Sequence, residues 1–299
     1  MNISIQNLNK VYGNNYQALT DVNLNIEPGM FGLLGPNGAG KSTLMKILVT
    51  LLSPSTGEIM VNGMPLSKNR KEVRSMIGYL PQDFRFFAKL KTYEFLDYAA
   101  SLAGITSRKE RRNEVEKLLE QVGLYEVRNR YANKLSGGMK RRLGIAQAIV
   151  GDPKMVIVDE PTTGLDPEER IRFRNILTDL SQRDVIIILS THIVGDISST
   201  CTQMALLNEG KIGFKGSPNQ FLEMSRGKVW RTHVNFDLME EFKQKYPVIT
   251  TIPDAKGYEV ELIAPNSDDF EGLSIEPNLE HAYVYFMEYV AGQEKIMQP

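Results

Sequence analysis

A phosphate-binding loop is the chemical feature that stands out first in the sequence. Residues 35–43 (GPNGAGKST) match the pattern GxxxxGK(S/T), which places Lys41 and Ser42 at the end of the loop. Glycines let successive backbone N–H groups turn inward, where they form an anion site at the positive end of the following helix. A triphosphate would fit this site, with Lys41 neutralising the β and γ oxygens and the Ser42 hydroxyl binding Mg²⁺ between them.

Two adjacent carboxylates, Asp159 and Glu160, follow the apolar residues 155–158. A continuously apolar run is typical of a buried strand in a parallel sheet, and ligands meet the carboxyl ends of such strands. We therefore expect Asp159 to reach Mg²⁺, directly or through water, and Glu160 to polarise an attacking water. His192 follows the apolar residues 185–189 and could hydrogen-bond a γ-phosphate, although a histidine alone at such a place is more often structural.

Two further groups could take part in binding a nucleotide. Residues 135–139 (LSGGM) open a second glycine-started helix, whose first turn is another candidate anion site. Tyr12 lies in a turn between two segments with near-alternating apolar residues. Its ring could stack on an adenine or only pack within the turn, and Tyr12 by itself does not favour either interpretation.

The elements around the phosphate loop are predicted to hold it at the end of a strand. Residues 30–34 read as a buried strand before the loop, and Leu44, Ile47 and Leu48 have helical spacing after it. Antiparallel strands are predicted on both sides of the turn at residues 12–15. A strand, a glycine loop and a helix start therefore coincide, which is the context that the motif requires.

The middle of the chain is predicted to be helical. Residues 93–102 and 115–122 carry apolar side chains at helical spacing, and the helical part is expected to cover about residues 83–150. Short strands are predicted earlier, at residues 58–63 and 77–80. Another helix is predicted after the turn that ends at Pro167, and the residues expected on its inward face are Ile171, Ile176, Leu177 and Leu180.

Composition limits the class of protein. The 299 residues, of which 42% are hydrophobic and 24% charged, suit one large globular domain or two. A net charge of −1 argues against attraction of the whole molecule to nucleic acid or to an anionic membrane. The single cysteine, Cys201, is more simply a buried thiol than a catalytic one, which is consistent with a reducing cytosol. The apolar runs are strand-length, so we expect no membrane-spanning segment.

Taken together, these motifs resemble those of the ATP-binding cassette (ABC) ATPases over about residues 1–225. Walker A alone is shared by many NTPases, whereas the Leu-Ser-Gly-Gly signature in this order with the other motifs is close to diagnostic. One departure is Met139, where many members carry glutamine, but the backbone amides that would bind phosphate are unchanged. The family motifs fall on Gly35, Pro36, Asn37, Gly38, Ala39, Gly40, Lys41, Ser42 and Thr43 for Walker A, Gln82 for the Q-loop, Leu135, Ser136, Gly137, Gly138 and Met139 for the signature, Asp159 and Glu160 for Walker B, Asp166 for the D-loop, His192 for the switch histidine and Tyr12 for the A-loop.

The resemblance implies an α/β fold, namely an ABC-type P-loop NTPase core with an antiparallel β subdomain and a helical signature subdomain. It also implies a head-to-tail dimer, because ATP in this family lies between Walker A of one cassette and the signature of the other. The chain would need a second cassette, which we expect to be an identical chain. Tyr12 would then stack on the adenine of the ATP that its own chain holds.

Roles at the phosphates follow from the same resemblance. Lys41 and the loop amides would hold the phosphates, while Ser42, Gln82 and Asp159 would organise Mg²⁺. Glu160 would act as the base on water. Each of these positions holds the residue type that the chemistry needs, which favours a hydrolysing subunit over one that only binds.

The remaining motif residues would act across the dimer interface. By family likeness, Ser136 and the amides of Gly137 and Gly138 complete the shell around the γ-phosphate of the partner. Asp166 and His192 connect the γ-phosphate and the attacking water to the opposite subunit. Closure of the dimer would therefore depend on ATP, and hydrolysis would release it.

Residues 226–299 are predicted to form a small accessory α+β appendage after a linker near residue 225. Strands are expected at residues 229–234, 248–252 and 258–264, a helix at residues 238–246 and a final helix from Leu279. This ending resembles the carboxyl terminus of ABC subunits from bacterial exporters of drugs, antibiotics and other small molecules. The expected role of the appendage is packing, dimer support or regulation.

The resemblance implies an ATP-binding and ATP-hydrolysing subunit of an ABC transporter, with ATP and Mg²⁺ as cofactors. Export of a drug, antibiotic, peptide or other small molecule is the expected direction. The subunit would be cytoplasmic, bound to integral membrane permease subunits at the inner face of the cell membrane, and no nucleic acid is expected as a partner. Phe84, Phe86 and Phe87 could accept the permease, although local packing explains these aromatic residues equally well.

A soluble ABC ATPase that acts on the ribosome or on DNA is the alternative. Ribosome-acting members typically join two cassettes through a long charged linker, whereas this chain carries one set of motifs. Chromosome-maintenance and repair ATPases insert long coiled coils between the two halves of the motif set. Here Lys41 and Ser136 lie within a hundred residues of each other, without sustained heptads between them. Both observations favour the transporter subunit.

Overall fold

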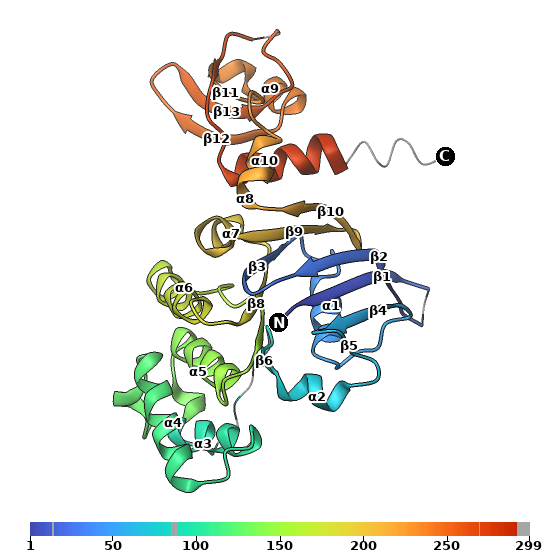
Figure 1. Cartoon of the computed structure of the whole chain (residues 1–299). Coiled ribbons are helices and arrows are strands. Elements are labelled where there is room, and N and C mark those ends of the chain that lie inside the picture. Colours follow the sequence, from blue (N-terminus) through green and yellow to red (C-terminus); the bar gives the residue numbers. More distant parts are fainter. Residues whose placement is uncertain (14, 85, 87–88, 269, 292–299) are drawn as a thin grey trace. The chain divides into compact units, whose positions relative to one another are not determined.

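The computed structural model describes residues 1–13, 15–84, 86, 89–268 and 270–291 of the chain. The chain divides into two compact units, the first comprising Met1–Asp196 with Thr200–Lys215 and the second Ile197–Ser199 with Gly216–Pro299 (Figure 1). This division falls earlier in the chain than the boundary near residue 225 that the sequence predicted. Phe87 lies outside the described residues. Among the residues described, no helix combines the length and the apolar character that crossing a membrane requires.

A six-stranded sheet forms the centre of the first unit. In spatial order its strands are β10 (Lys211–Gly216), β9 (Gln203–Asn208), β3 (Gly29–Leu34), β8 (Ile186–Thr191), β7 (Met155–Asp159) and β6 (Ile77–Leu80). β3 runs parallel to β8 and β9, and β7 runs parallel to β6 and β8. Every residue of β7 and β8 is buried, in agreement with their apolar sequences. The carboxyl ends of these parallel strands therefore share one edge of the sheet.

A second, antiparallel sheet belongs to the same unit. Its order is β2 (Gln17–Ile26), β1 (Ile3–Val11), β4 (Thr56–Val61) and β5 (Met64–Pro65). Asn62 and Gly63, with φ of 49° and 77°, form the two-residue turn between β4 and β5, as is typical of an Asn-Gly hairpin. Apolar residues of both sheets and of α1 (Lys41–Leu48) share one hydrophobic core. The predicted antiparallel subdomain is confirmed.

The helical part of the first unit contains three helices that contact one another. They are α3 (Thr92–Leu102), α4 (Arg108–Gln121) and α5 (Gly137–Ile149). Two short 3₁₀ turns, η1 (Tyr125–Val127) and η2 (Ala132–Lys134), connect α4 to α5. Phe95, Leu118 and Leu143 are among the buried side chains of these helices. The predicted helical subdomain is therefore present.

Other helices lie directly before or after strands of the central sheet along the chain. They are α2 (Arg70–Ser75) before β6, α6 (Pro167–Ser181) between β7 and β8, and α7 (Val194–Thr200) after β8. The buried residues of α6 are Phe173, Ile176, Leu177 and Leu180. Ile171, which the sequence predicted to face inward, is 49% exposed. At 3.6 residues per turn, position 171 falls on the face opposite Phe173, and the larger aromatic side chain is the one that enters the core.

The second unit is a small α+β structure with a core of its own. Its sheet has the order β12 (Val248–Pro253), β13 (Gly257–Ile263), β11 (Val229–Asn235) and β14 (Leu273–Ser274), with antiparallel neighbours. Its helices are α8 (Pro218–Glu223), α9 (Met239–Lys245) and α10 (Leu279–Tyr285), with the helical turns η3 (Phe236–Leu238) and η4 (Phe286–Val290). Val260 and Leu262 pack with aromatic residues such as Trp230 and Phe270. The sequence did not predict β14, because two residues are too few to show alternation and pairing with β11 makes them a strand.

Candidate functional site

Glycine residues give the phosphate loop its shape. β3 leads into residues 35–40, and α1 begins directly after them at Lys41. Gly40 caps α1 with a φ of 104°, a conformation that favours glycine. A Cβ at Gly35 would lie 2.2 Å from the carbonyl oxygen of Leu207, so this position also excludes other residue types. The loop can therefore follow the tight path that lets its amides and the first turn of α1 face a bound anion.

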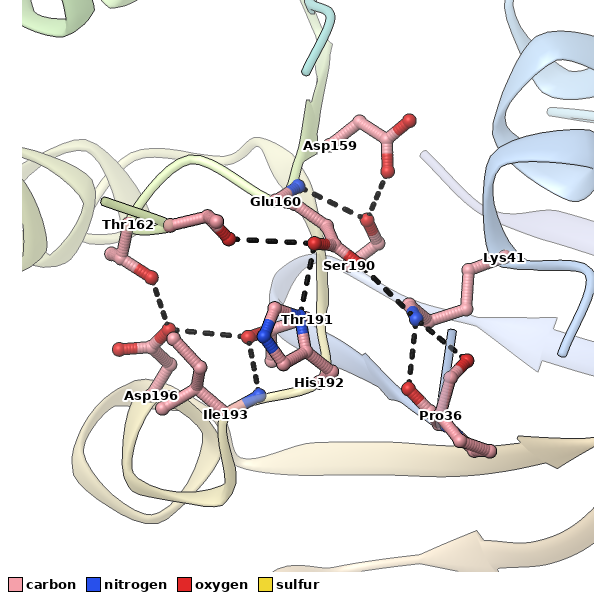
Figure 2. A network of polar contacts seen from close by, with 12 residues as sticks. Pro36, Lys41, Asp159, Glu160, Thr162, Ser190, Thr191, His192, Ile193 and Asp196 are labelled. Carbon is pink, nitrogen blue, oxygen red and sulfur yellow. Dashed lines mark hydrogen bonds and ion pairs between the residues drawn. The ribbon is translucent and has the colours of Figure 1, made fainter. Parts of the chain in front are cut away.

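Lys41 is buried and has three oxygen partners. Its Nζ donates to the carbonyl oxygens of Gly35 at 2.7 Å and of Pro36 at 3.1 Å. The third partner is Oε1 of Glu160, at 3.1 Å. Figure 2 shows the ammonium between the phosphate loop and Glu160. Lys41 is only 4% exposed, so this charge pair is screened much less than a pair at the surface.

Glu160 follows β7 directly and has an unusual backbone, with a φ of 47°. Its N–H donates to the carbonyl oxygen of Ser190 at 3.0 Å and to the Ser190 hydroxyl at 3.2 Å. Its carboxylate oxygen Oε2 lies 2.9 Å from Nδ1 of His192. A residue other than glycine held in the left-handed region costs about 1–3 kcal/mol, and such strain clusters at functional sites. The backbone of Glu160 is thus held where its carboxylate meets both Lys41 and His192.

Asp159 ends β7 and is buried beside Glu160. Its Oδ1 accepts a hydrogen bond from the Ser190 hydroxyl, so Ser190 contacts both acidic residues (Figure 2). Burial, and after it the charge of Asp159, raise the pKa of Tyr79 to about 12. Tyr79 therefore stays a neutral phenol at physiological pH.

A cleft of 520 Å³ opens over the phosphate loop. It brings together most of the residues that the sequence predicted to bind the phosphates and Mg²⁺, and it adds Thr163, which the sequence analysis did not single out. The residues that line it are Tyr16, Ala18, Asn37, Gly38, Gly40, Lys41, Ser42, Thr43, Gln82, Glu160, Thr163 and His192.

Oxygen donors in and beside this cleft fit a magnesium ion. Ser42 and Gln82 line the cleft, and Asp159 lies at the end of the adjoining strand. Hydroxyl, amide and carboxylate oxygens suit Mg²⁺, which usually takes only one or two carboxylates and completes its shell with water and substrate phosphates. A nucleotide in the cleft would supply those phosphates.

Two tyrosines stand beside the cleft, and the sequence predicted only one of them. The hydroxyl of Tyr12 lies 3.3 Å from Oγ1 of Thr43, and Tyr12 is 37% exposed. Tyr16 lines the cleft and stacks on Tyr12, with the ring centroids 6.4 Å apart. The available signal was a second aromatic residue directly after the predicted turn at residues 12–15.

Replacing Tyr12 with alanine is expected to weaken ATP binding by about 5- to 150-fold, since stacking of a base on an aromatic ring contributes about 1–3 kcal/mol. A similar loss is expected for GTP, because every base has a π face. Tyr16→Ala is the matched comparison and is expected to have the smaller effect, because Tyr16 is 53% exposed. Titration with each nucleotide measures both variants. Unchanged ATP affinity in Tyr12→Ala would contradict the predicted stacking role.

The signature and D-loop residues lie outside this cleft. Ser136 caps α5, with its hydroxyl accepting a hydrogen bond from the N–H of Met139 at 3.2 Å. Asp166 caps α6 in the same way and accepts from the N–H of Glu169 at 2.9 Å. Neither these two caps nor the signature glycines line the cleft over the phosphate loop. The two glycine-containing helix starts therefore do not meet within one chain.

A buried network of hydroxyl groups next to Glu160 was not predicted. Asp196 is fully buried, and its Oδ2 accepts from the hydroxyls of Thr162 at 2.5 Å and Thr191 at 3.2 Å. Oγ1 of Thr191 in turn accepts from the N–H of Ile193 at 2.9 Å. Figure 2 shows that this network ties the segment after Glu160 to the segment after β8. The threonines next to the predicted site residues were the available signal, but the sequence could not show that they meet.

Cys201 is a buried thiol, as predicted. It is 8% exposed, and burial raises its pKa to about 12. A thiol with this pKa stays protonated at neutral pH and is a poor nucleophile.

Comparison with known proteins agrees with the geometry of the site. Residues 19–163 match the family model described as ABC transporter. YxlF of Bacillus subtilis, an uncharacterized ABC transporter ATP-binding protein, is 34% identical over 251 residues, which cover 84% of this chain and 82% of that protein. The chain belongs to the ABC transporter ATP-binding proteins. As predicted, it is an ATP-binding subunit with the fold of an ABC ATPase.

Two further relatives of this ABC transporter subunit bear on its assembly and direction of transport. MJ0796, a bacterial ABC transporter cassette solved as a dimer, has 27% sequence identity and a TM-score of 0.66, with 72% of this chain and 98% of that chain covered. The methionine import ATP-binding protein MetN of Bordetella pertussis is 34% identical over 242 residues, which cover 78% of this chain and 67% of MetN. The predicted resemblance to drug and antibiotic exporters is therefore not confirmed, because MetN, named as a methionine import protein, has the same 34% identity as YxlF.

Proposed function

We propose that this ABC transporter subunit hydrolyses ATP, bound as its Mg²⁺ complex, in the cleft over the phosphate loop. The observation that carries the proposal is the buried contact of Glu160 with both Lys41 and His192. These contacts place a carboxylate, an ammonium and an imidazole beside the loop that would hold the phosphates. General base catalysis, charge neutralisation and orientation of the γ-phosphate could then occur at one point.

Lys41 has to exchange a partner when the nucleotide binds. An ammonium has three donors, and those of Lys41 meet oxygens of Gly35, Pro36 and Glu160. A phosphate oxygen that binds Lys41 replaces one of them, and Glu160 is the partner that phosphate repels. Once it has lost the ammonium, the Glu160 carboxylate has a free oxygen that can accept a proton from the water that attacks the γ-phosphate. The bond between the β and γ phosphates breaks, and ADP and phosphate are the products.

The other cleft residues orient the reactants in this proposal. We assign Ser42, Gln82 and Asp159 to Mg²⁺, which would neutralise charge on the phosphates while it is bound. We assign His192 to the γ-phosphate, since its ring contacts Glu160 and is 34% exposed on the cleft side. The amides of the phosphate loop bind the remaining phosphate oxygens.

The proposal requires a second cassette. Ser136, Gly137 and Gly138 lie apart from the cleft of their own chain, so they are available to the nucleotide of a partner. We propose a head-to-tail homodimer, in which Asp166 also faces the opposite site. The dimeric structure of the similar MJ0796 cassette supports this assembly.

We propose further that the dimer docks on separate permease subunits at the inner face of the cell membrane and drives export. Export rests on the resemblance of the last part of the chain to exporter subunits, and import, which the name of MetN gives for that relative, is the competing direction. With the cargo known, inside-out vesicles that carry the complex decide between the two. ATP-dependent accumulation of cargo inside them supports export, and ATP-dependent loss of preloaded cargo supports import.

Capture of the partner tests the transporter assignment directly. A tagged Glu160→Gln variant, which should retain ATP, is purified from detergent-solubilised membranes of its own host with ATP and Mg²⁺ present. Recovery of a polytopic membrane protein in near-equal amount supports the proposal. Recovery of ribosomes, DNA or the bare chain would overturn the docking claim and favour a soluble client.

Replacing Phe86 with alanine tests where the permease binds. Phe86 packs edge-on against Phe84 and Phe95, with ring centroids 4.6 Å and 5.0 Å apart, so part of its role is local packing. If Phe86 also anchors the permease, capture of the membrane protein should fall by about 30-fold, as for a typical interface hot spot, with ATPase activity preserved. Tyr98→Ala, which removes a 48% exposed aromatic from α3, is the control. Normal capture by a Phe86→Ala variant with a lowered melting temperature would leave packing as its only role.

A further inference from the structure

An ion pair outside the nucleotide cleft joins the signature helix to the helix that follows the D-loop. Nε of Arg142 in α5 lies 3.1 Å from Oε2 of Glu169 in α6, and Nη2 lies 3.3 Å from Oε1. The pair is therefore bidentate. The side chains of Arg142 and Glu169 are 7% and 17% exposed, so the pair is largely removed from water. Bidentate pairs of this kind give geometric specificity as well as energy.

Arg142 also reaches a third helix. Its Nη1 donates to the carbonyl oxygens of Val122 at 2.8 Å and Gly123 at 3.1 Å, which end α4. One guanidinium thus holds the end of α4, the body of α5 and the first turn of α6. Because its donors are planar and rigid, a rotation of one helix changes the geometry of the other contacts.

Glu169 touches a functional motif on each side. A Cβ built on Gly138 of the signature would lie 2.5 Å from the carboxyl group of Glu169, so the carboxylate packs directly on the backbone of that glycine. The N–H of Glu169 is the donor to the side chain of Asp166 in the D-loop. A single residue therefore contacts the signature with its side chain and the D-loop with its backbone.

Positive charge on two sides stabilises the Glu169 carboxylate at this position. The positive N-terminal end of α5 lies next to the Glu169 carboxylate, which favours the negative charge there. Arg142 balances that charge, since both carboxylate oxygens bind the guanidinium. Without Arg142, the carboxylate beside the signature amides that are to receive a γ-phosphate would keep only the longer contact to Arg172, whose Nη1 lies 3.7 Å from Oε1.

We propose that Glu169 is a positioning residue that couples the signature to the D-loop within one chain. The inference rests on the proposed function, in which the signature and Asp166 both face the nucleotide of the partner chain. When ATP draws the signature amides toward the partner, Gly138 and Arg142 shift Glu169, and Glu169 carries Asp166 with it. The opposite movement of Asp166 releases the signature. Two of the contacts that one chain makes to the second ATP are then engaged or released together.

The test compares nucleotide binding, which needs one chain, with dimerisation and ATP hydrolysis, which need two chains. Glu169→Gln keeps the shape of the side chain and removes its charge, and it should lower kcat and ATP-driven dimerisation by about tenfold, within the range of allosteric couplings. ADP binding, which uses only the Walker A side, should stay within about twofold of wild type. Dimerisation is measured by light scattering in the Glu160→Gln background. Asp179→Asn is the matched control, because Asp179 is an exposed acid further along the same helix, α6.

A double-mutant cycle with Arg142 shows whether the effect belongs to the pair. Arg142→Lys keeps the charge but loses the fork, and Arg142→Gln loses both. If the residues act as a unit, Glu169→Gln should change kcat by less than about twofold in the Arg142→Gln background. If the two substitutions lower kcat independently, so that their effects multiply in the double variant, the coupling is overturned. A Glu169→Gln variant with normal dimerisation and normal kcat would overturn it as well. Loss of ADP binding together with kcat would show a merely structural role and also overturn it.

Wild-type behaviour distinguishes this inference from the function on which it rests. If the wild-type chain neither hydrolyses ATP nor dimerises with ATP, the proposed function fails. If the wild-type chain does both and the Glu169 variants match it, only the coupling fails.

Discussion

Glu160→Gln is expected to slow ATP hydrolysis by about 10²- to 10⁴-fold, the contribution typical of a positioned general base. The amide cannot accept the proton of the attacking water, but it has nearly the shape of the carboxylate and retains an oxygen for Lys41. ATP should therefore bind at least as tightly as to wild type, because the carboxylate that competes with phosphate for Lys41 is gone. Phosphate release at saturating ATP measures the first effect, and calorimetric titration with ATP measures the second.

The outcome of this substitution discriminates between two roles for Glu160. If Glu160 only holds Lys41 and His192 in place, glutamine should lower kcat little, since it can still hydrogen-bond to both. If Glu160 is the base, the loss of kcat occurs without a loss of ATP affinity. Glu168→Gln, an exposed acid in the first turn of α6, controls for the removal of one negative charge. Full turnover by Glu160→Gln would remove Glu160 from the catalytic role.

Lys41→Ala is expected to reduce ATP affinity by about 10- to 140-fold. Hydrogen bonds to charged groups contribute about 1.5–3 kcal/mol, and each 1.4 kcal/mol is a factor of ten in affinity. The variant also leaves Glu160 buried without its ammonium, so a carboxylate that nothing neutralises would face the phosphates. Both effects have the same sign. Titration with ATP and with ADP measures them, and ATP should lose more affinity because it carries the additional phosphate.

Lys46 supplies the matched control for this second substitution. It lies in the last turn of the same helix, α1, and is exposed. Lys46→Ala removes the same charge from α1 without touching the phosphate loop, so ATP affinity should stay within about twofold of wild type, as for a screened surface charge. Equal losses in Lys46→Ala and Lys41→Ala would contradict a specific phosphate contact by Lys41.

The two substitutions together test whether the geometry at β7 and the phosphate loop acts as described. Glu160→Gln is expected to separate hydrolysis from binding, whereas Lys41→Ala is expected to impair binding first. A combined variant should resemble Lys41→Ala in affinity, with one difference. The neutral glutamine no longer repels phosphate, so part of the lost affinity should return.

Local patterns in the sequence were sufficient for β3, β7, the phosphate loop and the helix that follows the loop. Residues 30–34 and 155–158 are continuously apolar, and each proved to be a buried parallel strand. The glycines of the phosphate loop are required by backbone conformation, which the motif records directly. The inward face of α6 was predicted less well. Ile171 and Phe173 lie on opposite faces of the helix, and the residue at which the helix starts decides which of them enters the core. Periodicity alone leaves that start uncertain by a residue or two.

Which residues meet was decided by the tertiary structure. The sequence placed Lys41, Glu160 and His192 after the ends of predicted strands. That these strand ends are neighbours follows from the strand order of the sheet, in which β3 and β7 both pair with β8, and these pairings join segments far apart in the chain. Ser190, Thr191 and Asp196 were missed for the same reason, because their hydrogen bonds depend on segments far apart in the chain. Only the fold brings Arg142 to Glu169, whose separation of 27 residues hides their pairing in the sequence. The sequence by itself therefore determined the chemical groups and their local frames, and long-range strand pairing and helix packing determined their contacts.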